Sequence, residues 1–106
     1  MRGTPEQLMS KLKAGLVQVY GPQLRFVYLF GSYARGDADA ESDVDVLIVL
    51  EDFAHYGVEV DRTSELVASL SLEYSTSLST VFVRTSDWLH GESPFLASVR
   101  KEAIAA

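Results

Sequence analysis

The chain of 106 residues has room for one domain, and its 47% apolar and 23% charged residues are typical of a globular protein and unlike a disordered tail. Its net charge of −6 disfavours a protein that grips long nucleic acid through phosphate contacts, and the absence of cysteine excludes disulfides, zinc–thiolate sites and cysteine nucleophiles. No apolar stretch approaches the roughly 20 residues needed to cross a bilayer, and the polar N-terminus is unlike a signal peptide, so we expect a cytoplasmic protein with no membrane partner.

The first third of the chain predicts a helix followed by a buried strand. Thr4 and Gln7 form the pattern of a capping box, and apolar residues then recur at helical spacing, so we expect a helix over residues 5–20. Residues 24–30 are rich in β-branched and aromatic side chains and stop at Gly31. This is typical of a buried strand that runs into a tight turn.

A second strand is predicted after a short polar loop. Residues 33–42 are small and hydrophilic, which is enough for a helical turn and a loop. In the segment SDVDVLIVL, residues 42–50, one alternating face is wholly apolar, whereas the other begins with Asp43 and Asp45 and then becomes apolar. This pattern is expected of a central strand whose first end alone is exposed to a cleft.

The rest of the chain predicts a helix, a third strand and a final helix. A loop is expected at residues 51–57, and the helix after it carries a stripe made of Thr63, Leu66, Val67, Leu70 and Tyr74. Residues 76–83 alternate as a strand. Ser93-Pro94 is a cap followed by a first-turn proline and starts the final helix. One side of this helix should be lined by Phe95, Val99 and Ala103.

This order of elements predicts an α/β (α+β) domain in which helices cover a small sheet. The connection between the first two strands is too short for a full crossover helix, so these strands should pair antiparallel. We therefore expect a small mixed β-sheet in a single domain that spans residues 1–106.

The residues that carry chemistry are the Gly31-Ser32 turn and, after ten further residues, the pair Asp43 and Asp45. Gly31 can bring backbone N–H groups close to an anion, and Ser32 adds a hydroxyl donor, so this turn fits a triphosphate. On a strand, Asp43 and Asp45 point the same way with Cα atoms roughly 6.5–7 Å apart, a spacing from which both carboxylates can bind one cation or bridge two. Hard oxygen ligands favour Mg²⁺, completed by waters and substrate phosphates.

The segment GSYARGDADAESDVDVLIV resembles the signature of the minimal nucleotidyltransferases of the DNA polymerase β superfamily, which reads Gly-Ser, ten residues, Asp-x-Asp. The internal Ala34-Arg35-Gly36 and the pair Ser42-Asp43 fit the commoner bacterial and archaeal form of it. The order of elements from Thr4 to Glu102 also matches the minimal domain. The resemblance thus covers nearly the whole chain and implies a polymerase β-like nucleotidyltransferase fold.

The resemblance implies transfer of a nucleoside monophosphate, here AMP, from a nucleoside triphosphate, here ATP, to a hydroxyl, with pyrophosphate as the leaving group. Asp43 and Asp45 would be the catalytic carboxylates and would ligate two Mg²⁺ ions beside the α-phosphorus. The nucleotide would be bound by Gly31, Ser32, Arg35 and Ser42.

The sequence departs from the family pattern at the third carboxylate, which the family carries on the strand after the second helix. The inward positions there are Ser77 or Ser79, and a hydroxyl cannot replace a carboxylate as a base or as a charged ligand. Neither Glu73, at a helix end, nor Asp87, beyond the strand, fits that place. Weak, absent or partner-assisted catalysis therefore stays open.

The acceptor is a separate question, because larger nucleotidyltransferases bind it with a further domain that this chain has no residues left to build. Family members of this size resemble the antitoxin of HEPN–nucleotidyltransferase pairs, which transfer AMP to a tyrosine hydroxyl of the helical HEPN toxin. This implies a HEPN-type partner, which we expect at the segment from Trp88 to Ile104, and the negative net charge suits a basic partner. Two alternatives stay open: a catalytically degenerate binding module that neutralises or scaffolds a partner by contact, and a homodimeric small-molecule nucleotidyltransferase.

Overall fold

A mixed sheet with strand order β3-β2-β1-β4 organises the chain. The computed structural model describes all 106 residues. Its elements are α1 (Pro5–Tyr20), the 3-10 turn η1 (Gly21–Gln23), β1 (Leu24–Phe30), α2 (Ser32–Arg35), β2 (Val44–Leu50), α3 (Tyr56–Glu73), β3 (Leu78–Arg84), α4 (Thr85–His90), α5 (Pro94–Glu102) and β4 (Ile104–Ala105).

The pairing of the strands confirms the predicted mixed sheet. β1 and β2 are antiparallel, and Phe30 at the end of β1 lies opposite Asp45 near the start of β2. β3 runs parallel to β2 on its other side, and its register places Ser79 opposite Asp45. Asp45 therefore lies between the last residue of β1 and the second residue of β3.

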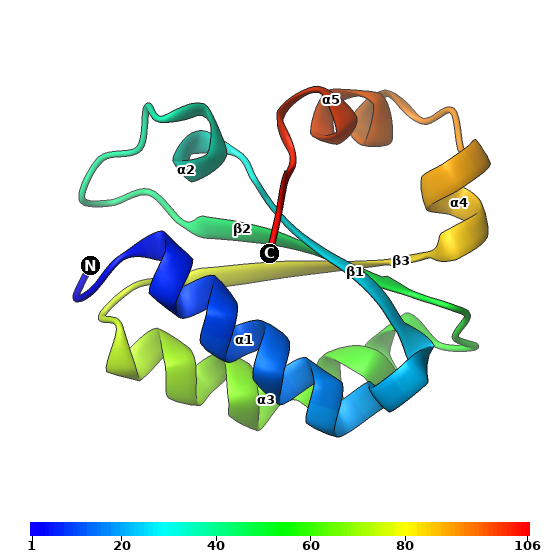
Figure 1. Cartoon of the computed structure of the whole chain (residues 1–106), viewed down its shortest axis with the longest axis horizontal. Coiled ribbons are helices and arrows are strands. Elements are labelled where there is room, and N and C mark those ends of the chain that lie inside the picture. Colours follow the sequence, from blue (N-terminus) through cyan, green and yellow to red (C-terminus); the bar gives the residue numbers. More distant parts are fainter.

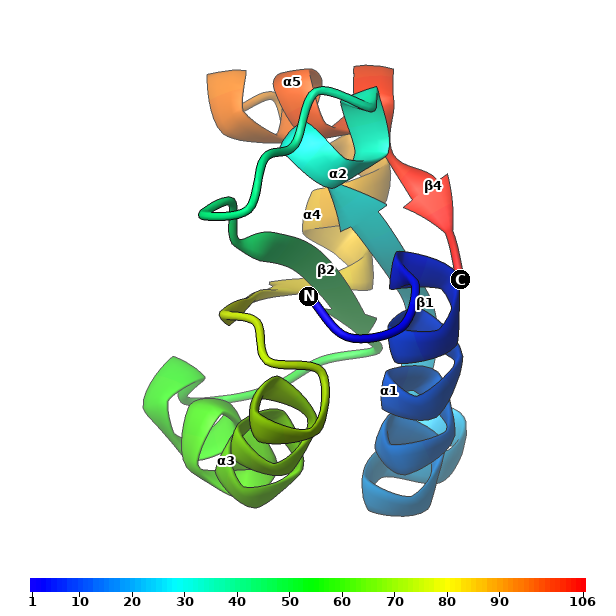
Figure 2. The same cartoon turned by 90° about the vertical axis from the view of Figure 1, so that its left-hand side faces the viewer.

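Helices cover both faces of this sheet (Figures 1 and 2). α1 and α3 lie side by side on one face, α4 and α5 lie on the other, and α2 lies at the end of β1, where its Tyr33 and Ala34 pack against the core beneath α1 and α3. Successive side chains of β2 point to opposite faces of the sheet and contribute to both cores. Val44, Val46 and Ile48 join the core beneath α1 and α3. Leu47 and Val49 pack with Val99 of α5 on the other face. Asp45, the second residue of β2, is the only residue of this strand that is not buried, and the exposed Asp43 precedes the strand.

α1 begins and ends where the capping pattern predicts. The backbone N–H of Thr4 donates to Gln7 Oε1 at 2.9 Å, and the backbone N–H of Gln7 donates to Thr4 Oγ1 at 3.1 Å. A buried hydrogen bond ties this helix to α3, since the Tyr20 hydroxyl donates to Glu59 Oε1 at 2.8 Å. Burial of the Tyr20 hydroxyl, together with this hydrogen bond, raises the pKa of Tyr20, so its proton stays in place.

The structure corrects several details of the second half. α3 begins at Tyr56, inside the expected loop, and β3 runs to Arg84. Phe95 was expected to face inward, but its side chain is 44% exposed, and α5 instead buries Leu96 and Val99. The edge strand β4 was not anticipated from the sequence. None of the helices is long and apolar enough to cross a membrane.

Candidate nucleotide site

The end of β1 and the start of β2 bring Gly31 against the Asp45 carboxylate. Gly31 has a φ of 75°, a left-handed conformation that glycine adopts without strain. A Cβ atom at this position would collide with Asp45 Oδ2. The Gly-Ser turn and the Asp-x-Asp pair, ten residues apart in the sequence, are therefore in direct contact, and only a glycine permits that approach.

The turn at Gly31 leads into the short helix α2. The backbone N–H of Arg35 donates to the Gly31 carbonyl, and those of Gly36 and Asp37 donate to the Ser32 carbonyl, each at 3.0 Å. The Ser32 side chain is half-buried, and its hydroxyl makes no hydrogen bond within the protein. This hydroxyl is thus available to a ligand at the place where the sequence predicts a triphosphate.

Asp43 and Asp45 are carboxylates without a basic partner. Neither forms an ion pair, although seven ion pairs occur elsewhere in the chain. Burial raises the pKa of Asp45, the neighbouring charge of Asp43 raises it further, and the Arg35 guanidinium opposes both effects. Two like charges in this position favour a bound cation.

The donor set fits Mg²⁺ that is bound together with a substrate. No three carboxylate or imidazole side chains lie close enough together to hold a metal ion by themselves. Mg²⁺ is commonly held by one or two carboxylates, and waters and substrate phosphates complete its coordination. Asp43 and Asp45 would supply those two carboxylates, and the Gly31-Ser32 turn lies against Asp45, where substrate phosphates would complete the coordination.

Arg35 lies in a charged cluster over the same site. Its Nε donates to Asp37 Oδ2 at 3.2 Å, and its Nη1 donates to Glu102 Oε2 at 2.8 Å. Glu102 is the last residue of α5 and also raises the pKa of Asp45 through its charge. Sequence reasoning missed Glu102, because an acid at the end of a helix gives no signal that it will meet a residue 67 positions away.

Ser42 shapes the loop that leads into the site. Its hydroxyl accepts from the backbone N–H of Asp39 at 2.9 Å, and its backbone N–H donates to the Asp39 carbonyl at 3.2 Å. These contacts close a turn immediately before Asp43. Contact between Ser42 and a nucleotide stays a prediction, since the hydroxyl here serves the protein itself.

The two serines at the expected third-carboxylate place lie on β3 and just before it. Ser79 is opposite Asp45, and the Ser77 carbonyl accepts from the backbone N–H of Val44 at 2.8 Å. Both side chains are exposed. A polar hollow of about 420 Å³ opens beside Ser77, and other hydroxyl residues line it, namely Ser42, Ser71, Ser75 and Thr76.

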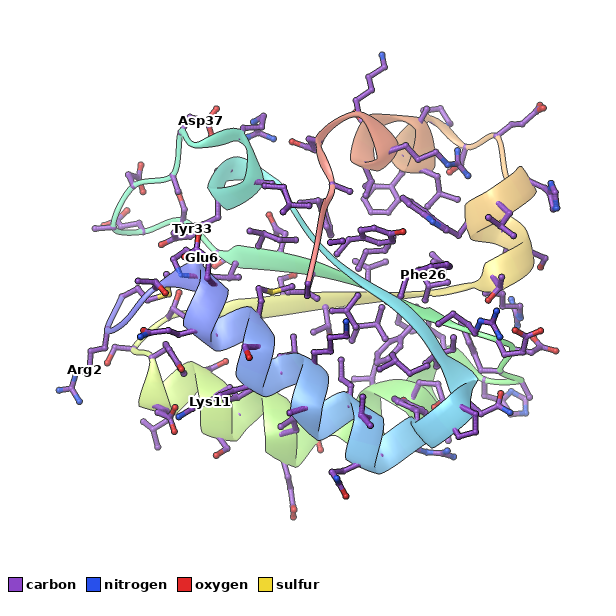
Figure 3. All side chains as sticks on the ribbon, in the orientation of Figure 1. Arg2, Glu6, Lys11, Phe26, Tyr33 and Asp37 are labelled. Atoms are coloured by element: carbon purple, nitrogen blue, oxygen red, sulfur yellow. The ribbon has the colours of Figure 1, made fainter.

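The largest hollow of the molecule lies elsewhere. It has a volume of about 570 Å³ between α1 and β4, and its lining is mainly apolar. Tyr33 lines it and lies close to Glu6 in the first turn of α1, whereas Asp37 lies on the outer loop (Figure 3). Lys13, the basic residue of this lining, donates to the Ala106 carbonyl at 2.8 Å. This hollow does not contain the carboxylate pair, so we do not assign the nucleotide to it.

Comparison with known proteins identifies the family. The family model described as "Nucleotidyltransferase domain" matches residues 9–89. The chain belongs to this nucleotidyltransferase family. The matched range of this nucleotidyltransferase domain contains the whole segment from Gly31 to Asp45 and both serines of the third position, whereas α5 and Glu102 lie outside it.

Individual relatives agree with this assignment. The nucleotidyltransferase domain is 33% identical over 78 residues to MJ0141 of Methanocaldococcus jannaschii, a protein to which protein adenylyltransferase activity is attributed; the match covers 74% of this chain and 78% of that one. A toxin–antitoxin crystal structure with AMP-PNP has a TM-score of 0.61 at 22% identity, with 96% of this chain and 72% of that chain covered. A crystal structure of a nucleotidyltransferase-like protein from Sulfolobus solfataricus has a TM-score of 0.59 at 21% identity, with 98% and 87% covered. The structural neighbours share the fold.

Proposed function

We propose that this nucleotidyltransferase domain transfers AMP from ATP, bound with Mg²⁺, to a tyrosine hydroxyl of a HEPN-type toxin, and so acts as its antitoxin. The observation that carries the proposal is the contact between Gly31 and the unpaired Asp45 carboxylate. This contact joins a turn suited to phosphates to a pair of oxygen ligands suited to Mg²⁺.

The acceptor and the nucleotide are supported by the relatives. MJ0141 carries the name of a protein adenylyltransferase, and a structural neighbour is a toxin–antitoxin complex that contains AMP-PNP. The acidic surface of this chain, with net charge −6, would complement a basic partner and speed its association. Cytoplasmic localisation is part of the same proposal.

In the proposed reaction, each group of the chain has one task. Gly31 and Ser32 bind the triphosphate, Arg35 contacts a phosphate oxygen, and Asp43 and Asp45 hold the metal. Bound Mg²⁺ would stabilise the charge that develops on the attacking and leaving oxygens. The tyrosine oxygen forms a bond to the α-phosphorus, the bond from that phosphorus to the bridging oxygen breaks, and pyrophosphate leaves.

A tyrosine acceptor suits a site whose third carboxylate is replaced by serine. The phenolic hydroxyl has an ordinary pKa of about 10, so it releases its proton to water more readily than an aliphatic hydroxyl does. A general base at the position of Ser77 or Ser79 is therefore less necessary. An acceptor with an aliphatic hydroxyl would depend much more on the missing carboxylate.

Intact mass measurement of the partner tests the proposal. The chain is co-expressed with the product of the neighbouring gene, which is then purified and weighed. A mass increase of one or more AMP units that disappears with Asp43→Asn or Asp45→Asn supports the transferase. Asp61→Asn is the matched control, because Asp61 is an exposed acid of α3 away from the site and its substitution should leave the transfer intact.

The binding module is the second candidate, and the serines at the third position favour it. A tight complex with no mass change would identify this alternative. No complex at all would favour a homodimeric small-molecule nucleotidyltransferase, and the oligomeric state of the purified chain would then decide.

A further inference from the structure

Glu102 reaches the nucleotide site from the far end of the chain. Its carboxylate accepts a hydrogen bond from Arg35 Nη1 at 2.8 Å, and its side chain is only 19% exposed. The Arg35 side chain is half exposed, so the pair depends on the hydrogen-bond geometry and on the burial of Glu102. Glu102 lies beyond residues 9–89, so the family match assigns it no role.

The Arg35 guanidinium is held on two of its edges. Nε donates to Asp37 and Nη1 to Glu102, while Nη2 has no partner in the protein. A planar guanidinium bound in this way keeps a fixed orientation, and its free edge can take one more oxygen. That free edge fits the phosphate contact assigned to Arg35 above.

Asp37 and Glu102 also keep Arg35 from forming an ion pair with Asp45. Arg35 lies close enough to Asp45 to act on it electrostatically, yet no ion pair forms between them. A cation next to two unpaired carboxylates would move onto them if nothing else held it. Arg35 on Asp43 or Asp45 would occupy the oxygens that a metal needs.

We propose that Glu102 is a positioning residue of the nucleotide site, which holds Arg35 beside the Gly31-Ser32 turn and off Asp43 and Asp45, so that both carboxylates stay open to Mg²⁺. This inference rests on the proposed function. It adds that the last turn of α5, outside the matched domain, completes the site.

The proposal predicts a specific change in metal dependence. Without the Glu102 charge, Arg35 moves towards Asp45, and Mg²⁺ has to compete with it. Loss of the negative charge of Glu102 favours the phosphate anions and offsets the displaced Arg35 contact, so nucleotide affinity measured without Mg²⁺ should change much less than the Mg²⁺ requirement. A general loss of structure would weaken both the response to Mg²⁺ and the nucleotide affinity without Mg²⁺. A loss that is confined to the Mg²⁺ response therefore indicates a positioning role for Glu102.

The test is a Mg²⁺ titration of the melting temperature at a fixed concentration of an ATP analogue with a methylene bridge between the α- and β-phosphates. Glu102→Gln should raise the Mg²⁺ concentration for half the effect by roughly tenfold. Glu102→Asp keeps the charge and should restore part of the wild-type response. Glu92→Gln removes an exposed acid just before α5 that forms no ion pair, and it should behave as the wild type.

The Arg35→Ala background decides whether Glu102 acts through Arg35. There, Glu102→Gln should change the Mg²⁺ requirement little, because no guanidinium is left to hold. An equal effect in both backgrounds, or no effect of Glu102→Gln in the wild type, would overturn the proposal. Arg35→Lys keeps the positive charge but lacks the planar guanidinium that binds Asp37 and Glu102 together, so it should raise the Mg²⁺ requirement as Glu102→Gln does. It provides a second readout if Glu102 variants fold poorly. A wild-type chain that ignores Mg²⁺ and nucleotide altogether would instead refute the proposed function.

Discussion

Gly31 is the residue on which the candidate site depends most directly. Its backbone lies against the Asp45 carboxylate in a left-handed conformation, so both its missing side chain and its dihedral freedom are used. The motif match in the sequence finds this residue, but the reason for glycine there is visible only in the packing.

Gly31→Ala should damage both stability and ligand binding. We expect a loss of roughly 1–3 kcal/mol in the free energy of unfolding from backbone strain and displacement of Asp45. The stabilisation by Mg²⁺ and nucleotide should disappear as well. Gly57→Ala is the control, since a Cβ there meets no atom within 4 Å, and it should leave both measurements nearly unchanged. Urea unfolding with and without ligand measures the two effects, and a Gly31→Ala protein that still responds to ligand would contradict this account.

In the ligand-free chain, replacement of Asp45 should stabilise the fold, whereas replacement of Gly31 destabilises it. Because the folded state raises the pKa of Asp45, chiefly through burial, ionisation of this group at neutral pH costs folding free energy. Asp45→Asn should therefore raise the melting temperature at pH 7 by a few degrees at most, since the side chain is only half-buried. The gain should shrink as the pH falls through the folded-state pKa, where wild-type Asp45 is protonated. Calorimetry without Mg²⁺ at several pH values checks this, and a gain that grows towards acid pH would exclude it.

Ser79 is the place to restore a third carboxylate, because the register sets it directly opposite Asp45. Ser79→Asp should raise the rate of AMP transfer by roughly 10–100-fold if a base is what the site lacks. Ser77→Asp, one pleat earlier, should have the smaller effect. Ser79→Asn has a similar shape without the charge and serves as the control. Transfer that is lost in Ser79→Ala would show that the hydroxyl itself takes part.

Between elements, the link from α1 to α3 carries a buried charge. Glu59 is 6% exposed, and the Tyr20 hydroxyl is its hydrogen-bond donor, while Arg62 lies 3.7 Å from the same oxygen. The link lies on the face of the sheet opposite α5. We therefore expect it to affect stability and not the nucleotide site.

Tyr20→Phe should leave the Glu59 carboxylate short of a partner in a buried place. The expected cost is roughly 1–3 kcal/mol of unfolding free energy. Tyr28→Phe removes a hydroxyl that makes no hydrogen bond in the protein and should cost much less. Thermal unfolding of the two variants compares them, and equal losses would mean that the Tyr20–Glu59 bond contributes nothing of its own.

The sequence predicts an element well where its pattern of apolar residues is compatible with only one arrangement. The alternation in residues 42–50 distinguishes both faces of β2, and the short connection before it leaves only antiparallel pairing. α5 has nine residues, too few turns to define its buried side, so Phe95 was expected inside where Leu96 is found. The contact of Arg35 with Glu102 depends on how α5 settles on the sheet, and no local pattern encodes that.

At the scale of the whole molecule, the α4–α5 face is the surface at which we expect the proposed partner to bind. Leu89 is 59% exposed and Phe95 is 44% exposed, beside Trp88, on which the Arg100 guanidinium stacks at 5.2 Å. Exposed apolar side chains grouped in this way are typical of protein contacts. This face adjoins the nucleotide site through Glu102.

Leu89→Ser should weaken the complex with the proposed toxin partner by roughly tenfold or more while leaving the fold intact. Val58→Ser is the control, since Val58 is 47% exposed on α3, across the sheet. Titration of the labelled partner against each variant measures the dissociation constants. A complex weakened by Val58→Ser and not by Leu89→Ser would move the interface to the opposite face.

The contact between Gly31 and Asp45 also has a consequence for the order of folding. Gly31 directly follows β1, and Asp45 lies on the antiparallel neighbour β2, so this half of the site arises from a local hairpin, the kind of structure that closes early because little chain entropy is lost. The contact between Arg35 and Glu102 spans 67 residues and has to wait until α5 docks. If Glu102 positions Arg35 as proposed, a folding chain can have its phosphate turn and carboxylates in place while Arg35 is still free to approach Asp45, and the docking of α5 then clears the metal position.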